Sequence, residues 1–496
     1  MAALLRPDLY RQWLDPGRLC PELREVDADR PNERLVQWVW RQQRLRDDAL
    51  RTAEGRRLRV LHPGFWNREP GPDFREAVLQ FDDEPPVTGD VEVDLEPADW
   101  NRHGHGANPA FRQVRLHAVW RLNGPPAAPA ATVALQPALD APFEEIVHWL
   151  ESEHGEAAPA EEGACARAWS RLPAALVTDL VEQAALVRLE RKAHRIRARA
   201  REAGWEAALW EAVFTALGYK HNVWPMRHLA RVLPRLGADR PDVAGWQTRL
   251  LGAAGFLPRD LTRRDPTVDR YVRRAWDRWW REQAAFQSIC LPASAWRLAG
   301  VRPANRPERR LALAAHWLAR GDVPGALEQW LAEDISPQRL IPSLAAVLRP
   351  GEDDFWVRHW TLQASCATPM RLLGDQRLGD LAVNVILPWL WCRAEVGGQS
   401  ALRGRVEERY LRWPALQDNA VLRLARARLL PAWEPPRPLR AAHQQGLLQM
   451  VRDFCGHSDA CCRGCPLPAR LARLVGEIEA AEPGNAGNPG GSTRHS

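Results

Sequence analysis

The chain has 496 residues, of which 45% are hydrophobic and 26% are charged. This length exceeds what one core usually supports, and the composition is that of a folded chain, so we expect at least two domains. No apolar run is long enough to cross a bilayer, and Arg6 and Asp8 interrupt any signal-peptide core. We therefore expect a cytoplasmic protein without membrane contact. The net charge of +6 permits a polyanionic partner such as nucleic acid but does not identify one.

The first predicted element is a helix over residues 31–45, with Asn32 as its N-cap and Glu33 in its first turn. Four later segments are rich in β-branched residues, partly alternate in polarity, and are bounded by Pro, Gly or Asp, which is typical of strands. They are residues 57–62, 74–81, 87–96 and 112–122. The expected order is a helix, three strands, a short polar connection and a further strand.

The periodicity changes after a Pro/Ala-rich region. Segments 124–132 and 154–164 are rich in Pro, Ala, Gly and Glu, with one short predicted helix between them, and from Ala168 onward apolar residues recur at helical spacing. The predicted fold class is α+β, with an N-terminal mixed sheet followed by a large all-helical domain. The predicted parts are an α/β domain at 1–125, a linker region at 126–165, a helical domain at 166–440, a cysteine-rich metal-binding segment at 441–475 and a disordered tail at 482–496.

Three carboxylates are expected to converge in the predicted sheet. Asp73 follows the turn-forming Gly71 and Pro72 and opens a strand, whereas Glu92 and Asp94 lie two apart on the next strand and share one face. If the two strands pair as a hairpin, the carboxylates can bind Mg²⁺ or Mn²⁺ and support phosphodiester hydrolysis. The alternative is that Asp73 caps a turn while the other two acids lie on a solvated sheet face.

Two histidines follow in a Gly-containing loop. His103 and His105 lie two apart, so both imidazoles can point the same way and can ligate a metal, transfer protons or contact phosphate. The alternative is that they are solvated surface residues. His117 lies within a predicted strand, and we expect it to be a core histidine rather than a ligand.

The order of these elements resembles the PD-(D/E)XK nuclease-like core over roughly residues 31–122. The resemblance implies that Asp73 and Glu92 are metal ligands, that Glu33 acts beyond them or on a second ion, and that the substrate is DNA or RNA. The departure is Asp94, because such nucleases usually have a lysine there that orients the attacking water. Either His103 or His105 then supplies the proton-transfer group, or the site binds metal without turnover, or it is degenerate.

Several motifs in register also resemble an uncharacterised bacterial family, a domain of unknown function. The matching stretches are Asn67 with residues 71–74, residues 91–94, Asp99 and Trp100 with His103 and His105, and Val114 with residues 116–119.

Four cysteines lie close together near the C-terminus. This cluster predicts a metal site, with zinc as the default metal, at Cys455, Cys461, Cys462 and Cys465. Neighbouring cysteines rarely reach one ion together, so we expect Cys455, Cys462 and Cys465 with a fourth ligand from His443, His457 or Cys461. An iron–sulfur cluster with Cys20 as the fourth ligand, by resemblance to nucleases that carry one, and clustered free thiols are the alternatives. The scattered cysteines, Cys165 among them, are expected to be packing residues.

A basic turn precedes a predicted helix at residues 302–310. Arg302, Asn305, Arg309 and Arg310 there can contact phosphate, and the alternative is a solvated helix end whose arginines pair with acids. Together these features predict a metal-dependent nuclease. The alternatives are a catalytically inactive nuclease-like protein that binds nucleic acid or acts as a scaffold, and a hydrolase of small molecules that uses the His103/His105 pair.

Overall fold

The computed structural model describes residues 8–14, 31–46, 48–67, 70–143, 146, 163–219, 222–258, 260–261, 270–299, 301–455, 462 and 465–481. The chain divides into two compact units, and both are discontinuous in sequence. The terminal unit comprises residues 1–24, 152–188 and 417–496, and the central unit comprises residues 25–151 and 189–416. Helix α6 (Ala174–Ala203) runs in sequence from the terminal unit into the central one.

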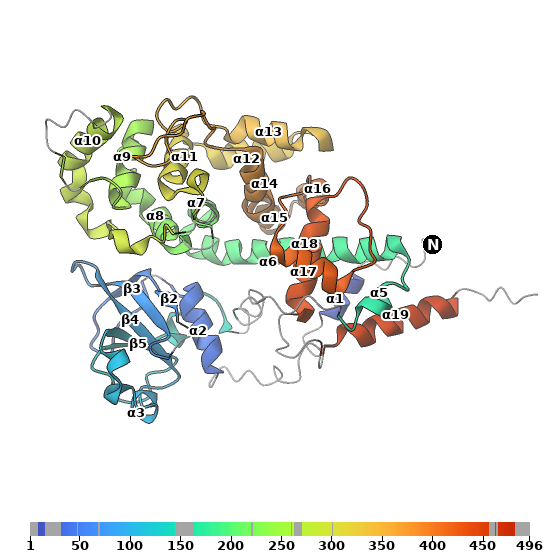
Figure 1. The fold of residues 1–496 in the computed structure, drawn as a ribbon, viewed down its shortest axis with the longest axis horizontal. Helices are drawn as coiled ribbons and strands as arrows, with labels where there is room; N and C mark the ends of the chain where they lie inside the picture. The colour runs from blue at the N-terminus through green and yellow to red at the C-terminus, as the bar shows by residue number, and fades with distance from the viewer. Residues whose placement is uncertain are drawn as a thin grey trace, which may run out of the picture. The chain divides into compact units, whose positions relative to one another are not determined.

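A six-stranded mixed sheet opens the central unit, which confirms the predicted α+β class (Figure 1). Its order is β1-β3-β4-β5-β6, with β2 also paired to β3. Strand β3 is antiparallel to both of its neighbours, β1 and β4, whereas β4, β5 and β6 are parallel. The strands are β1 (Leu58–His62), β2 (Phe65–Trp66), β3 (Phe74–Phe81), β4 (Val87–Asp94), β5 (Val114–Val119) and β6 (Ala131–Ala134). Strand β6 falls inside the segment that the sequence assigned to a linker.

Helix α2 (Glu33–Gln42) lies beside this sheet (Figure 1). The side chain of Asn32 accepts a hydrogen bond from the backbone N–H of Arg34 at 2.9 Å, which confirms the predicted N-cap. Val36, Val39 and Trp40 recur at helical spacing, are fully buried and belong to the same apolar core as the strands. The helix therefore packs through one face, and Glu33 and Gln37 lie on another, half-buried part of its surface.

The strand register decides which polar side chains share a face of the sheet. Phe74 pairs with Val91 in the β3–β4 hairpin, and Glu92 pairs with His117 in the parallel β4–β5 ladder. Because side chains alternate between faces, Glu92, Asp94 and His117 point to the same side, while Val91 and Val93 fill the core on the other.

The rest of the central unit is helical, as predicted. Between residues 200 and 400, the described part of the chain contains no β-strand and only one isolated bridge, His359 with Ser365. The helices of this unit after the sheet are α7 (Trp205–Leu217), α8 (Val223–Leu236), α9 (Val243–Ala253), α10 (Arg270–Phe286), α11 (Pro307–Arg320), α12 (Val323–Ala332), α13 (Leu340–Leu348), α14 (Asp375–Leu381), α15 (Leu387–Val396) and α16 (Ser400–Arg412). In the described residues, no helix combines the length and apolarity needed to cross a bilayer.

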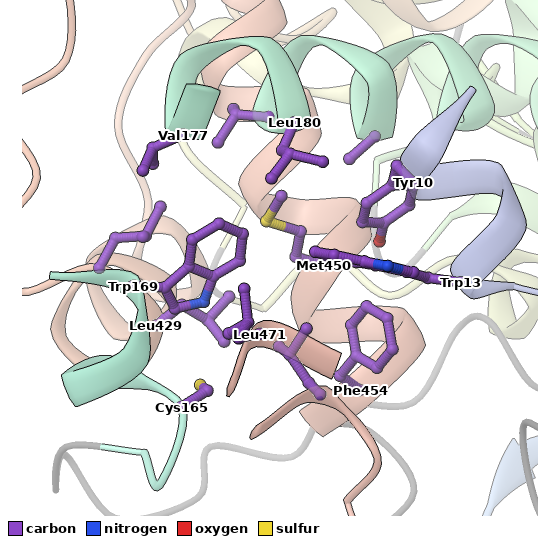
Figure 2. Close-up of a cluster of buried hydrophobic side chains, with 14 of the residues drawn as sticks. Tyr10, Trp13, Cys165, Trp169, Val177, Leu180, Leu429, Met450, Phe454 and Leu471 are labelled. Atoms are coloured by element: carbon purple, nitrogen blue, oxygen red, sulfur yellow. The ribbon is translucent and has the colours of Figure 1, made fainter. Parts of the chain in front are cut away.

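The terminal unit gathers short helices from three distant stretches of the chain around one apolar cluster (Figure 2). Its helices, besides the first part of α6, are α1 (Leu9–Trp13), α5 (Ala166–Trp169), α17 (Ala420–Leu429), α18 (Ala441–Met450) and α19 (Leu467–Ala481), with a π-helical turn at Val451–Cys455. Aromatic rings of Trp13, Trp169 and Phe454 lie in this cluster. The predicted disordered tail at 482–496 and most of the predicted helix after residue 143 lie outside the described residues.

Candidate active site

In the β3–β4 hairpin, the carboxylates of Asp73 and Glu92 each accept a hydrogen bond from a backbone N–H of the opposite segment. Oε2 of Glu92 accepts a hydrogen bond from the backbone N–H of Asp73 at 3.0 Å. In turn, Oδ2 of Asp73 accepts one from the backbone N–H of Val93 at 3.1 Å. The two carboxylates therefore occupy fixed positions on adjacent strands, as the predicted hairpin requires.

Glu33 reaches the same site from helix α2. The side-chain amide of Gln37 donates to Oε1 of Glu33 at 3.2 Å and to Oδ1 of Asp73 at 3.0 Å, so it bridges the two acids. The sequence reasoning did not single out Gln37. Its position four residues after Glu33, one helical turn along the same face, is the signal that could have found it.

Asp94 lies at the centre of three histidines. Oδ1 of Asp94 is 3.1 Å from Nδ1 of His103, and its Oδ2 is 2.9 Å from Nε2 of His117. Nε2 of His105 is 3.0 Å from Oε1 of Glu92 and 3.9 Å from Oδ2 of Asp94. Ligand atoms of Asp94, His103 and His105 all lie within 4.8 Å of one another, which is close enough to surround one metal ion.

A small apolar cluster packs next to the imidazole rings of the site. It contains Trp100, Phe111 and Val114. The ring of His105 stacks on Phe111 with the centroids 4.1 Å apart, and Trp100 lies 5.3 Å from the rings of both His105 and His117. His117 is fully buried, as expected for a core histidine, but its bond to Asp94 also makes it part of the site. The sequence analysis did not assign it that role, because only the parallel register places it opposite Glu92.

Burial makes the negative charges of this site costly. It raises the pKa of Asp73 to about 7 and that of Glu92 to about 9, and the repulsion between neighbouring carboxylates adds to both shifts. Burial also raises the pKa of Glu33 and lowers the pKa of the His105 imidazole. Among the described contacts of Asp73, Glu92 and Asp94, none is made by a lysine or arginine.

The donor set fits a divalent cation. Carboxylate oxygens suit Mg²⁺ and Mn²⁺, and imidazole nitrogens extend the choice toward transition metals. A cation beside these groups would offset the repulsion between the carboxylates and let Asp73 and Glu92 ionise at neutral pH. His103 keeps 35% of its side chain exposed, so it is the histidine most accessible to a substrate.

A cleft of about 350 Å³ begins next to the strand that carries Asp73. Its walls include two arginines, Arg75 and Arg297, and two aromatic residues, Phe65 and Trp66. Asn67, which also lines the cleft, donates its backbone N–H to the carbonyl of Asp73 at 2.7 Å. The cleft therefore offers cationic and aromatic side chains close in the chain to the carboxylates.

The predicted basic turn is arranged differently from the expectation. Arg309 is almost fully buried, and its guanidinium donates to the backbone carbonyls of Trp356, His359, Met370 and Arg371. This corrects its assignment as a nucleic-acid contact. The guanidinium N–H groups donate inside the fold, to backbone carbonyls of an irregular segment.

The other three residues of that prediction differ in exposure. Arg310 is buried and donates to the carbonyl of Leu372 at 3.0 Å and to the side chain of Asn305 at 2.7 Å. Asn305 also accepts a hydrogen bond from Tyr219, and only Arg302 is exposed. Whether Arg302 contacts nucleic acid stays a prediction.

The structure describes only some of the residues of the predicted C-terminal metal site. Cys455, Cys462 and Cys465 are described, whereas Cys461, His457 and Cys20 lie outside the described residues. His443, proposed as a fourth ligand, is buried in α18 with Nε2 at 3.4 Å from Glu182 and Nδ1 accepting from the backbone of Arg440. Its two ring nitrogens thus already have neighbours other than cysteine.

Comparison with curated proteins and with solved structures finds no match. A family pattern described as protein of unknown function (DUF2851) matches residues 33–417, which include the sheet and all the residues of the candidate active site. The motifs around Asp73, Glu92 and His103 predicted membership of an uncharacterised family, and this match confirms it. Because it covers well over half of the chain, the protein belongs to the DUF2851 family.

Proposed function

We propose that this protein is a metal-dependent phosphodiesterase that acts on nucleic acid, with its active site at Asp73, Glu92 and Asp94. One observation carries the proposal. The buried carboxylates of Glu92 and Asp94 and the half-buried carboxylate of Asp73 converge beside two histidines, and none of their described contacts is to a lysine or arginine. Uncompensated buried carboxylates are costly, and binding a cation is a common reason for retaining them.

Each side chain has a distinct role in the proposed reaction. A bound Mg²⁺ or Mn²⁺ ion would lower the pKa of a water molecule and neutralise charge on the scissile phosphate. Asp73, Glu92, Asp94 and His105 would supply the ligand atoms: those of Asp94 and His105 lie within 4.8 Å of each other, and Nε2 of His105 is 3.0 Å from Oε1 of Glu92. An imidazole ligand would favour Mn²⁺ over Mg²⁺. The attacking water forms a bond to phosphorus as the bond to the leaving oxygen breaks.

His103 takes the place of the absent lysine. Its Nδ1 is held by Asp94 at 3.1 Å, so its other ring nitrogen is free to point outward and to exchange a proton with the water or the leaving oxygen.

The neighbouring cleft supports a nucleic-acid substrate. Arg75 and Arg297 can contact phosphate oxygens, and the rings of Phe65 and Trp66 can stack with bases. The guanidinium of Arg297 lies 5.1 Å from the Phe65 ring centroid, so the cationic and aromatic groups form one surface.

A second candidate is a protein that binds nucleic acid, or serves as a scaffold, without cutting it. The observation that favours it is the acidic residue at position 94, where an ammonium would stabilise charge on the reacting phosphate. In that case the cleft would bind DNA or RNA while Asp73 and Glu92 could be replaced without loss of function.

The test uses purified full-length protein with single-stranded and duplex DNA and RNA, each with Mg²⁺ or Mn²⁺. We expect cleavage by the wild type and a fall of at least about a hundredfold in Asp73→Asn, since ligand loss removes several kcal/mol of transition-state stabilisation. Asp83→Asn is the matched control, because Asp83 follows the same strand but is 88% exposed.

The outcomes separate the candidates. Salt-dependent binding without cleavage, equal in wild type and Asp73→Asn, would leave only the binding protein. Hydrolysis of small phosphodiesters or other esters without affinity for DNA or RNA would favour the small-molecule hydrolase instead.

A further inference from the structure

The terminal unit contains four described cysteines that come from two distant parts of the chain. Cys165 precedes α5, Cys455 ends the π-helical turn after α18, and Cys462 and Cys465 precede α19. Helix α5 packs against both α17 and α19, which brings residue 165 next to a segment almost three hundred residues later. The sequence alone treated Cys165 as an ordinary packing residue.

Contacts around Gly163 bring Cys165 and Cys462 close together. A Cβ atom at Gly163 would lie 3.4 Å from Sγ of Cys165 and 3.6 Å from Sγ of Cys462, so both sulfur atoms border the same point. The backbone N–H of Ala164 donates to Sγ of Cys462 at 3.4 Å. The glycine itself donates to the carbonyl of Arg428 at the end of α17, at 2.9 Å, which holds this turn in place.

The other two thiols complete the group. The backbone N–H of Cys465 donates to the carbonyl of Cys462 at 3.2 Å, and its thiol lies 3.6 Å from the carbonyl of Phe454, the residue before Cys455. Cys455 and Cys465 both pack against the apolar cluster that contains Cys165, at whose margin Figure 2 shows that thiol.

Electrostatics agree that the four sulfurs are neighbours. Burial raises the pKa of Cys165 to about 12, and the nearby thiols of Cys455, Cys465 and Cys462 contribute to that shift. Burial likewise raises the pKa of Cys455 to about 12, whereas the Arg428 guanidinium opposes this effect. That guanidinium also lies 3.6 Å from Sγ of Cys462.

We propose that Cys165, Cys455, Cys462 and Cys465 are the four ligands of one thiophilic metal centre that joins the separate segments of the terminal unit. Cys165 replaces His443, His457, Cys461 and Cys20 as the fourth ligand. Thiolates are the ligands that zinc and iron–sulfur clusters select, and a bound metal would deprotonate them despite their burial.

The spacing favours an iron–sulfur cluster over zinc. Four sulfurs around one zinc ion would be about 3.8 Å apart, given Zn–S bonds of roughly 2.3 Å in a tetrahedron. Among the described cysteines, no three sulfurs lie within 4.8 Å of one another. A cluster of several iron atoms holds its ligands farther apart than one zinc ion does.

The test measures zinc, iron and acid-labile sulfide in full-length protein purified without oxygen, and does not depend on nuclease activity. We expect one metal centre per chain, with iron and sulfide in equal amounts. Cys165→Ser should lose most of this metal, because removing a direct ligand costs more than the roughly tenfold affinity loss of an outer partner. Cys392→Ser is the control, since Cys392 is equally buried but belongs to α15 of the central unit.

Three outcomes bear on the inference. Stoichiometric zinc that is lost in Cys165→Ser would support the four-cysteine site and overturn the iron–sulfur assignment. Full metal content in Cys165→Ser, or neither metal in the wild type with all thiols free to react, would overturn the site itself. Cys462→Ser, at a half-buried position, provides the same comparison if Cys165→Ser does not fold, with circular dichroism as the check on folding.

Discussion

The candidate active site and the four-cysteine site are built in opposite ways. Most of the active site comes from one hairpin and the strand beside it, so its ligands lie within about fifty residues, with Glu33 added from the preceding helix. The four cysteines come from segments almost three hundred residues apart. The first site depends on strand register, and the second depends on how distant helices pack.

The two sites also differ in charge when no metal is bound. Burial and the neighbouring carboxylates raise the pKa values of Asp73 and Glu92, so ionising both groups at neutral pH is costly when no metal is bound. The thiols of Cys165 and Cys455 have pKa values raised to about 12, so without metal they are neutral and pack as apolar groups. A cation should therefore lower the cost of ionisation at the first site and cross-link chain segments at the second.

After loss of the ligand Asp73, the largest effect should come from His117, which only the strand register places in the site. His117→Asn removes the buried partner that orients Asp94, and we expect catalytic efficiency to fall by about 10- to 100-fold, as for other residues that position metal ligands. Metal affinity measured by titration should fall in parallel. The matched control is His316→Asn, because His316 forms a similar buried pair with Asp353 at 2.8 Å outside the site.

Equal losses of activity in the two histidine variants would show that His117 is merely structural. Recovery of activity in His117→Asn at high Mn²⁺ concentration would support a positioning role.

A smaller effect should follow from a change at the turn beside the thiols. In Gly163→Ala the new Cβ would lie 2.9 Å from the carbonyl oxygen of Arg428, which is too close, so we expect a loss of about 1–3 kcal/mol in the free energy of unfolding. Denaturant unfolding measures it.

Gly476→Ala in α19 is the matched control, because nothing lies within 4 Å of its Cβ position and alanine favours helix. That variant should be slightly more stable than the wild type. Equal stability of Gly163→Ala and the wild type would contradict the close approach of the two segments.

The smallest expected effect is a pH dependence of the melting temperature, which comes from the carboxylates of the candidate active site. The pKa of Asp73 is raised from 3.8 when exposed to about 7 when folded, so the folded state binds its proton more tightly. That contribution to stability is complete below the exposed pKa and is lost as the pH rises through about 7. Metal-free protein should therefore melt a few degrees lower at pH 8 than at pH 5.

Two comparisons check the origin of this pH dependence. Asp73→Asn should make it less steep without abolishing it, because the pKa of Glu92 is also raised, to about 9. Added Mn²⁺ should reduce it by stabilising the ionised carboxylates. An equally steep decline in Asp73→Asn would assign the effect to groups other than Asp73.

Local sequence patterns predicted much of the sheet and the helices. The N-cap at Asn32, the hairpin of β3 and β4, and the change to helical periodicity after Ala168 depend on short-range spacing and turn residues, and the structure has all three. The short strands β2 and β6 were missed, because two to four residues in a Pro/Ala-rich setting carry no periodic signal.

The sequence by itself determined that Asp73, Glu92 and Asp94 share a region, because strand alternation and a turn at Gly71 and Pro72 act over neighbouring residues. Only the tertiary structure decided that Asp94 meets three histidines, that Arg309 turns inward to backbone carbonyls, and that Cys165 meets Cys462. The physical reason is that each of these contacts joins residues on separate elements of the fold. Packing and strand register bring those residues together in space, and no local pattern of residue types predicts such a contact.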